Sequence, residues 1–328
     1  IGGRRVNAVL TPKDFATSQE VRWCPGCGDY AILKAVQKAL ADVGATPEST
    51  AFISGIGCAS RFPYYVNSYG FHTIHGRAPA LATGLKLANP DLDVWVVTGD
   101  GDGLSIGGNH LLHALRRNVD LKILLFNNEI YGLTKGQYSP TSRVGTRSPS
   151  SPAGSLDTPV SPGQFVLGAG GHFFARAIDT DKAGMSHVLE AVHAHTGTAF
   201  VEIFQNCIVY NENVFADFTD RKNAANTQLH LRHGEPMLFG DGKGIRFNPT
   251  TYSLDVVDAD DDVLVHDETN AVIARLLIDL KMPVALGVLF RQPVAGYAGR
   301  FYAEHPTGFE RTKSVADYLA GPNPWVVE

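Results

Sequence analysis

The chain has 328 residues, 44% of them hydrophobic and 19% charged, which is ordinary for a globular protein with a sizeable core. Its net charge of -5 argues against a general nucleic-acid binder, and no run approaches the roughly 18 apolar residues of a membrane-spanning helix. The first ten residues, IGGRRVNAVL, lack the apolar core of a signal peptide. With only four cysteines, these features predict a cytoplasmic protein that binds neither nucleic acid nor membrane.

Predicted strands and helices alternate along the chain. The first helix is predicted over residues 31–44, where apolar residues recur at three- and four-residue spacing and Gly44 supplies a stop. The elements that follow are a strand at 51–57, a helix at 78–89, a buried strand and loop at 93–103, a helix at 105–118, a strand at 121–128, and strands at 173–179 and 198–206 around a helix at 183–197. The alternation predicts an α/β fold with a mostly parallel sheet flanked by helices.

Two segments depart from this alternation. Residues 139–161 have loop chemistry throughout, and we weigh a mobile linker equally against a lid or partner-contact loop. From residue 208 onward the chain is more polar and irregular, with a helix suggested at 270–280 and a strand at 282–290. We therefore predict one α/β domain over 1–215 and an irregular C-terminal extension, 216–328, packed on the same domain.

The cysteines are Cys24, Cys27, Cys58 and Cys207. The first two form a Cys-Pro-Gly-Cys sequence, which suits a redox dithiol, half of a zinc site, or two corners of an iron–sulfur cluster. Four thiolates equally suit tetrahedral zinc and a cubane cluster. The cysteines alone favour zinc.

A second motif follows two successive predicted strands. VVTGDGDGLSIGGNH fits neither the dinucleotide fingerprint nor a P-loop, but it places Asp100 at the carboxyl end of a buried strand. Asn127 and Asn128 end the next strand. Because neighbouring parallel strands end at the same sheet edge, we expect these side chains to lie together, with hard oxygen ligands for a Mg²⁺ ion that also holds a diphosphate.

This Gly-Asp-Gly and Asn-x-Ile arrangement resembles the thiamine diphosphate motif. The sequences GDGDGLSIGGNHLLHALRRN, NNEIYGLTKGQ, GIGCASRFPYY and VEIFQNC resemble in particular the beta subunits of 2-oxoacid:ferredoxin oxidoreductases. The resemblance implies the diphosphate-type thiamine diphosphate-binding fold. It also implies that Asp100, Asn128 and the carbonyl of Ile130 bind Mg²⁺.

The resemblance further implies one [4Fe–4S] cluster, held by Cys24, Cys27, Cys58 and Cys207, in place of zinc. It carries over further contacts with thiamine diphosphate, which fall on Ile56, Gly57, Cys58, Ala59, His75, Gly101, Asp102, Gly132, Leu133 and Thr134. A lone histidine is more often structural, and it is the resemblance that gives His75 a role at the cofactor and in catalysis.

The implied reaction is the coenzyme A-dependent oxidative decarboxylation of a 2-oxoacid, or its reverse, with electrons passed to ferredoxin. The activating glutamate of thiamine enzymes would come from an alpha subunit with the pyrimidine-binding domain. The chain is therefore expected to be inactive alone and to work in an (αβ)₂ assembly.

The sequence SRFPYY resembles the members that act on 2-oxoglutarate more than those that act on pyruvate. Arg61 is the candidate for binding the far carboxylate of such a substrate. Its alternative role is packing on Phe62 and Tyr64, which we weigh equally. The competing interpretations are action on pyruvate or another 2-oxoacid, a thiamine decarboxylase or synthase, a zinc-stabilised nucleotide-binding protein, and a non-catalytic subunit that carries only the cluster.

Overall fold

A computed structural model describes residues 10–304, 316, 319 and 321 of the chain. The prediction about the first ten residues therefore falls outside the described residues for 1–9. In the part that is described, no helix is both long and apolar enough to cross a membrane.

The first half of the chain contains α1 (Asp29–Asp42), β1 (Thr50–Ser54), β2 (Tyr69–His72), α2 (Ala78–Ala88), β3 (Asp93–Gly99), α3 (Asp100–Leu104), α4 (Gly108–Arg117), β4 (Lys122–Asn127), β5 (Ile130–Tyr131) and β6 (Gln137–Tyr138), with short 3₁₀ helices η1 (Pro12–Phe15), η2 (Pro47–Ser49) and η3 (Ala59–Tyr64). The second half contains α5 (Pro162–Gly168), β7 (Phe173–Ile178), α6 (Lys182–Ala194), β8 (Ala199–Phe204), α7 (Ala216–Thr219), α8 (Ala224–Thr227), β9 (Gln228–His230), β10 (Leu238–Phe239), β11 (Lys243–Asn248), β12 (Ser253–Asp258), α9 (Ala271–Asp279), β13 (Val284–Arg291) and α10 (Tyr297–Glu304).

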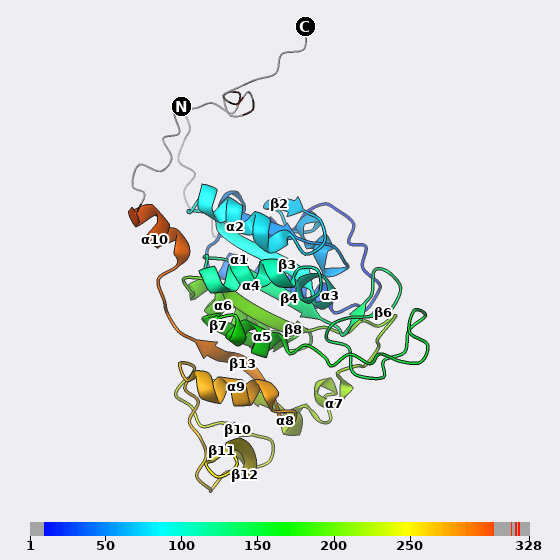
Figure 1. Cartoon of the computed structure of the whole chain (residues 1–328), viewed down its shortest axis with the longest axis vertical. Helices are drawn as coiled ribbons and strands as arrows, with labels where there is room; N and C mark the ends of the chain where they lie inside the picture. The colour runs from blue at the N-terminus through cyan, green and yellow to red at the C-terminus, as the bar shows by residue number, and fades with distance from the viewer. Residues whose placement is uncertain (1–9, 305–315, 317–318, 320, 322–328) are drawn as a thin grey trace.

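The main sheet has eight strands in the order β2-β1-β3-β4-β8-β7-β13-β9. The first six strands in this order, which end with β7, are parallel to one another. The strand β13 is antiparallel to β7. Helices α2, α4 and α5 cover one face, and α1 and α6 cover the other (Figure 1). The predicted α/β fold with a mostly parallel sheet is confirmed.

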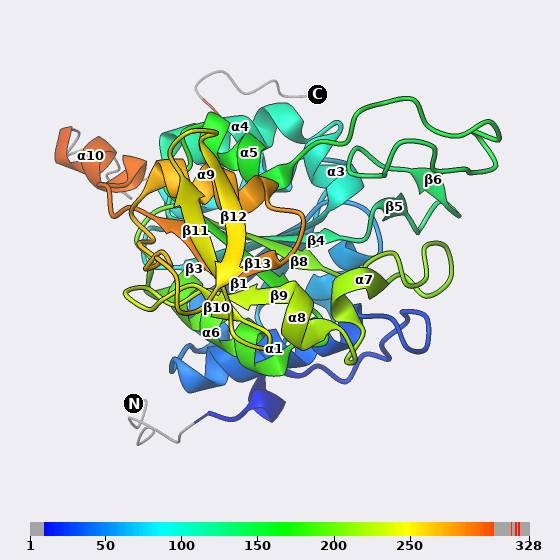
Figure 2. The same ribbon diagram turned by 90° about the horizontal axis from the view of Figure 1, so that it is seen from below.

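The alternation of side chains along β3 explains how the sheet fills both cores. Val94 and Val96 pack with the residues under α2 and α4, whereas Trp95 and Val97 pack with those under α1 and α6. Because successive side chains of a strand point to opposite faces, a strand that is apolar throughout needs helices on both sides. The view along the sheet shows these two helical layers (Figure 2).

Two local predictions need correction, and one helix was not predicted. Residues 100–104, expected to be a loop, form the short helix α3, and the helix expected from Ser105 begins at Gly108. The segment 139–161 is followed directly by α5, which the loop-rich sequence concealed. A separate three-stranded antiparallel sheet, β10-β11-β12, occupies part of the segment that was predicted to be irregular.

The segment after residue 215 contributes to the main sheet as well as to this small one. β13 lies between β7 and β9, and it supplies buried residues to both helical layers. The proposed division at residue 215 stays a prediction, and its second part extends beyond the described residues.

Candidate active site

A single cavity lies at the carboxyl ends of the central parallel strands. It is lined by all the residues that were predicted to contact thiamine diphosphate and Mg²⁺, namely Ile56, Gly57, Cys58, Ala59, His75, Asp100, Gly101, Asp102, Asn128, Ile130, Gly132, Leu133 and Thr134. Asp29, Gly99, Phe126, Tyr131 and Gln205 complete its lining. We call this the cofactor cavity.

Asp100 begins α3 directly after β3 and is 2% exposed. Its Oδ2 atom accepts hydrogen bonds from the hydroxyls of Ser139 at 2.5 Å and Thr141 at 2.6 Å. Burial raises the pKa of Asp100 to about 6, although these two hydroxyls act in the opposite direction. A buried carboxylate with this raised pKa is stabilised by a nearby cation, which suits a metal ligand.

Asn127 and Asn128 follow one another but face different surroundings. The Nδ2 of Asn127 donates to Glu202 at 2.8 Å, and Asn127 does not line the cofactor cavity. Asn128 lines it, with Nδ2 donating to Gln205 Oε1 at 2.7 Å and Oδ1 facing the backbone N–H of Ile130 at 3.2 Å. The amide oxygen of Asn128 therefore points toward the backbone of Ile130, whose carbonyl is also predicted to bind Mg²⁺. Of the two asparagines expected near Asp100, only Asn128 lines the cavity.

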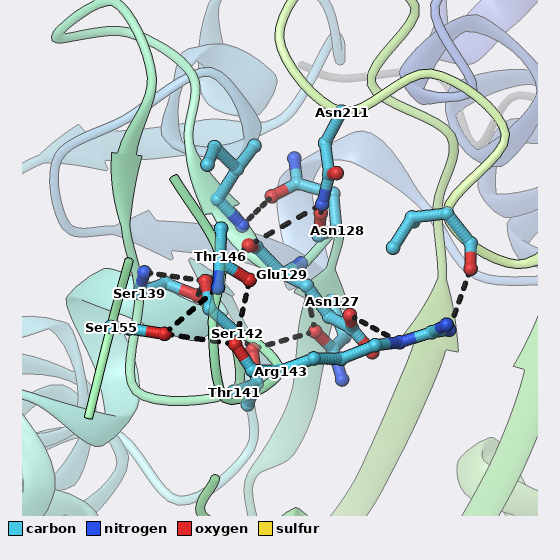
Figure 3. Close-up of polar contacts among 12 residues, drawn as sticks. Asn127, Asn128, Glu129, Ser139, Thr141, Ser142, Arg143, Thr146, Ser155 and Asn211 are labelled. Carbon is cyan, nitrogen blue, oxygen red and sulfur yellow. Dashed lines mark hydrogen bonds and ion pairs between the residues drawn. The ribbon is translucent and has the colours of Figure 1, made fainter. Parts of the chain in front are cut away.

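The start of the segment 139–161 is part of this site. Beyond the bonds to Asp100, Ser142 donates to the backbone oxygen of Glu129, and Arg143 Nε pairs with Glu129 Oε2 at 3.1 Å. Arg143 also donates to the carbonyl of Val214 at 2.6 Å. Figure 3 shows these side chains converging on the turn after β4. The segment is anchored at its N-terminal part to the turn that carries Asn128.

Asp102 joins the backbone at Ile56 and at Gly76 to strand β3. Its Oδ1 accepts from the N–H groups of Ile56 at 3.1 Å and Gly76 at 2.8 Å, and its Oδ2 accepts from Thr98 Oγ1 at 2.7 Å. The Nδ1 of His75 lies 3.1 Å from the same Oδ1. The carboxylate of Asp102 is thus satisfied by the protein. Its effect is to orient the half-exposed ring of His75, whose Nε2 stays free for a ligand.

The cavity brings backbone close to any ligand it holds. A Cβ atom on Gly101 would lie 2.2 Å from the ring of Tyr131, whose hydroxyl donates to the carbonyl of Gly101 at 3.0 Å. Gly57 has φ +130, which side-chain-bearing residues rarely adopt. Both glycines are therefore required by the local geometry, and neither adds a side chain to the space that a ligand would fill.

The four cysteines line a second, adjoining cavity, the cysteine cavity. It is walled by Arg22, Trp23, Cys24, Cys27, Asp29, Cys58, Arg61, Asn128, Gly132, Leu133, Gln205, Cys207, Ile208, Val209 and Tyr210. All four cysteines are free of disulfides. A Cβ atom on Gly132 would lie 3.5 Å from Cys207 Sγ and 3.6 Å from Cys58 Sγ. The fold therefore gathers residues from four distant parts of the sequence around one space.

The Cys-Pro-Gly-Cys sequence forms a tight turn at this cavity. The N–H of Cys27 donates to the carbonyl of Cys24 at 3.0 Å, and Gly26 has φ +87. Proline followed by glycine in the left-handed region is typical of a type II turn. The turn places both cysteines at the cavity, with Cys24 exposed and Cys27 partly buried.

Electrostatics in the cysteine cavity disfavour uncompensated thiolates. Burial, together with the nearby carboxylate of Asp29, raises the pKa of Cys27, and it raises that of Cys58 to about 12. Within the described part of the chain, no three His, Cys, Asp or Glu side chains are grouped closely enough to hold one metal ion.

Arg61 lies one step outside the cofactor cavity. It lines the cysteine cavity and a more open outer cavity that includes Gly57 and Leu133, which the cofactor cavity shares. Its Nε donates to the hydroxyl of Tyr65 at 3.2 Å. Arg61 is therefore held by Tyr65 in a space next to the cofactor cavity, and both its predicted role at the substrate and the alternative packing on Phe62 and Tyr64 stay predictions.

Sequence reasoning missed several side chains of the site. Ser139 and Thr141 come from loop chemistry that carries no recognisable motif. Gln205 lies two residues before Cys207, and Asp29 lies two residues after Cys27. This closeness in sequence to a predicted cluster ligand could have identified them as residues of the site. Both line the two cavities at once.

Comparisons with known proteins agree with these observations. Residues 55–203 match the family described as "Thiamine pyrophosphate enzyme, C-terminal TPP binding domain". The chain is 55% identical over 259 residues to the 2-oxoglutarate oxidoreductase subunit KorB of Mycobacterium tuberculosis, covering 78% of this chain and 69% of the relative. It is 43% identical over 188 residues to the 2-oxoglutarate synthase subunit KorB of Methanothermobacter marburgensis, covering 57% of this chain and 66% of that relative.

A solved structure extends the similarity to the whole fold. It is a 2-oxoglutarate:ferredoxin oxidoreductase from Magnetococcus marinus with 2-oxoglutarate, coenzyme A and succinyl-CoA bound, and it matches with 33% identity and a TM-score of 0.74. The match covers 95% of this chain and 97% of that one. The chain belongs to the family of beta subunits of 2-oxoglutarate and other 2-oxoacid:ferredoxin oxidoreductases, a family of oxidoreductase subunits.

Proposed function

We propose that this chain, as the beta subunit of a 2-oxoglutarate:ferredoxin oxidoreductase, binds thiamine diphosphate with Mg²⁺ and one [4Fe–4S] cluster. With an alpha subunit it would convert 2-oxoglutarate and coenzyme A to succinyl-CoA and CO₂, or run the reverse reaction. One observation carries this proposal: the cofactor and cysteine cavities share Asp29, Cys58, Asn128, Gly132, Leu133 and Gln205 as common walls.

The residues of the cofactor cavity fit a Mg²⁺–diphosphate group. The carboxylate of Asp100, the amide oxygen of Asn128 and the carbonyl of Ile130 form the hard oxygen set that Mg²⁺ prefers, with remaining positions left to phosphate and water. The N–H groups around Gly57 and Gly101 can bind phosphate oxygens. Asp102 fixes the ring of His75, so that its free nitrogen can donate to or accept from the bound ligands.

The residues of the cysteine cavity fit an iron–sulfur cluster. Four free thiols surround one space, and the raised pKa values of Cys27 and Cys58 indicate that their thiolates need a cationic partner. When bound, thiamine diphosphate supplies an electron sink for decarboxylation and the cluster accepts the released electrons one at a time. The shared walls would keep that transfer short.

The proposed alpha subunit completes the site. Thiamine enzymes need a glutamate to activate the cofactor's aminopyrimidine ring. The acids among the described residues that line the cofactor cavity are the aspartates Asp29, Asp100 and Asp102. We therefore keep the proposal that the alpha subunit supplies the glutamate, in an (αβ)₂ assembly. The compartment we propose is the cytoplasm, where four free cysteines stay reduced.

Ferredoxin is the proposed electron carrier, and a basic groove supports this assignment. On the outer side of the Cys-Pro-Gly-Cys turn, Pro25, Gly26, Cys27 and Gly28 line a groove that also contains Lys34, Lys38, Lys182 and Arg221. One acidic side chain, Asp179, lines it too, and it is buried. An acidic partner would be attracted to this side of the cysteines.

The substrate assignment rests on the 2-oxoglutarate relatives and on Arg61. A second carboxylate distinguishes 2-oxoglutarate from pyruvate, and Arg can bind it with two parallel hydrogen bonds. The position of Arg61 beside the entrance to the cofactor cavity is compatible with this role. Pyruvate or another 2-oxoacid is the alternative substrate.

The test is anaerobic co-production of the chain with its alpha subunit. We expect iron and sulfide in the complex, and reduction of ferredoxin that requires 2-oxoglutarate, coenzyme A and Mg²⁺–thiamine diphosphate. The chain produced alone should bind the cluster but not turn over. Zinc without iron, or full activity of the chain alone, would contradict the proposal.

A further inference from the structure

Gln205, like its hydrogen-bond partner Asn128, has a side-chain amide that lines both cavities. It follows β8 directly, is 1% exposed, and its backbone N–H donates to the carbonyl of Asn127 at 2.9 Å, which fixes it to β4. Its side chain lines both the cofactor and the cysteine cavity. The proposed reaction assigns no role to this uncharged side chain.

The hydrogen bonds of this amide settle its orientation. Oε1 accepts from Asn128 Nδ2 at 2.7 Å, while Nε2 donates to the carbonyl of Asn206 at 2.7 Å and to Cys27 Sγ at 3.1 Å. The reversed amide would set two NH₂ groups against each other at Asn128 and two oxygens against each other at Asn206. The observed orientation is therefore the one that satisfies all three neighbours.

Each end of the amide acts on a different centre. By accepting from Asn128 Nδ2, Gln205 turns the oxygen of that amide away from itself and toward the Ile130 side. By donating to Cys27 Sγ, it stabilises negative charge on that sulfur. Among the described residues, Gln205 supplies the only side-chain N–H that is bonded to a cysteine sulfur.

We propose that Gln205 is a positioning residue that sets the Mg²⁺ affinity of the cofactor cavity through Asn128 and the reduction potential of the cluster through Cys27. The inference rests on the proposed function. Reduction adds negative charge to a cluster, so an N–H bond to a ligand sulfur favours the reduced state and raises the potential. Groups that orient a metal ligand commonly change metal affinity by about 10- to 100-fold when they are removed.

Two substitutions in the αβ complex separate the two effects. Gln205→Met keeps the length but loses both bonds, so the cluster potential should fall and the Mg²⁺ concentration for half-saturation should rise by about 10-fold. Gln205→Glu keeps an acceptor for Asn128, so its Mg²⁺ requirement should stay within about threefold of wild type. Its potential, measured at pH 8.5, should fall below that of Gln205→Met, because a carboxylate then faces Cys27.

The control is Gln37→Met. Gln37 is also a buried glutamine, and its Nε2 donates to the carbonyls of Phe15 at 3.3 Å and Tyr65 at 3.1 Å. Its substitution should change neither the potential nor the Mg²⁺ requirement, although it removes comparable bonds. Potentials would be read from redox titrations followed by electron paramagnetic resonance.

The outcomes are distinguishable. A wild-type potential in both Gln205 variants would overturn the role at Cys27, and a wild-type Mg²⁺ requirement in Gln205→Met would overturn the role at Asn128. If Gln205→Met does not fold, the potential of Gln205→Glu decides alone. A wild-type complex without iron would instead refute the proposed function before any variant is compared.

Discussion

At the residue scale, two carboxylates with the same short motif have different surroundings. Asp100 offers a buried carboxylate to the cofactor cavity and is held by hydroxyls from a distant loop. Asp102 directs its carboxylate into the protein, where it joins backbone turns. The sequence Gly-Asp-Gly-Asp predicts that one acid binds metal, but it cannot show which carboxylate is already satisfied. The cofactor contact of Asp102 stays a prediction, and a backbone contact would suit it better than a carboxylate contact.

Arg61 allows a prediction about substrate preference. If its guanidinium binds the far carboxylate of 2-oxoglutarate, Arg61→Ala loses a charge-assisted pair worth about 1.5–3 kcal/mol. The KM for 2-oxoglutarate should then rise by about 10- to 100-fold, while the KM for pyruvate should change little. Steady-state rates of the αβ complex with both substrates measure this.

The same experiment needs two further variants. Tyr65→Phe removes the hydroxyl that accepts from Arg61 Nε, so it shows how far orientation contributes. Arg22→Ala removes an exposed arginine of the same outer cavity that is paired with Glu20 at 3.0 Å, and it should not alter the substrate ratio. An unchanged ratio in Arg61→Ala would remove Arg61 from substrate binding.

At the element scale, prediction worked where local periodicity and burial agree. The helix α1 has a clear apolar face and ends just before Gly44, whose φ of +72 requires glycine. The strands β3 and β4 are apolar along most of their length because helices cover both faces. Short elements such as α3 and α5 are set by tertiary contacts, so a few residues of sequence do not reveal them.

The segment 139–161 gives an element-scale prediction. Ser139 and Thr141 tie it to the buried carboxylate of Asp100. In a Ser139→Ala, Thr141→Val double variant that carboxylate loses both hydroxyl donors, at a cost of about 1–3 kcal/mol each. The segment should open more often, and trypsin should cleave after the exposed Arg147 roughly 10-fold faster than in wild type.

The matched control lies in the same segment. Ser150→Ala removes an exposed hydroxyl whose hydrogen-bond partner is Ser148 and not Asp100. Cleavage should therefore stay at the wild-type rate. Limited proteolysis followed by mass spectrometry identifies the cleaved bond. Equal cleavage of wild type and double variant would show that the segment is not held by Asp100.

At the scale of the whole molecule, strand order was beyond the reach of the sequence. Because predicted strands and helices alternate along the chain, β3 and β4 were expected to be neighbours. This expectation correctly brought Asp100 and Asn128 to one sheet edge. The insertion of β13 between β7, to which it is antiparallel, and β9, to which it is parallel, depends on contacts between residues far apart in the sequence, such as Gly287 with Arg176 and Val284 with Gln228. An apolar strand sequence such as VALGVLFR carries no information about its neighbour or direction.

The distribution of charge over the molecule gives the last prediction. Lys34 on α1 and Lys182 on α6 lie on neighbouring helices of one face and line the basic groove beside Cys27 (Figure 2). Neither lysine has an ion-pair partner among the described residues, so both are available to a docking protein. Lys34→Glu with Lys182→Glu should raise the ferredoxin concentration for half-maximal rate by about 10-fold and weaken its dependence on salt.

A small dye separates docking from catalysis in this experiment. Viologen reduction by the double variant should equal that of wild type, because a small acceptor needs no protein docking surface. The charge-matched control is Arg116→Glu with Arg117→Glu, at the end of α4 on the opposite face of the sheet, and it should leave the ferredoxin dependence unchanged (Figure 2). If the lysine reversals leave ferredoxin reduction unaffected, the carrier docks elsewhere. If they lower viologen and ferredoxin rates equally, they disturb the site itself, and the groove is not the docking surface.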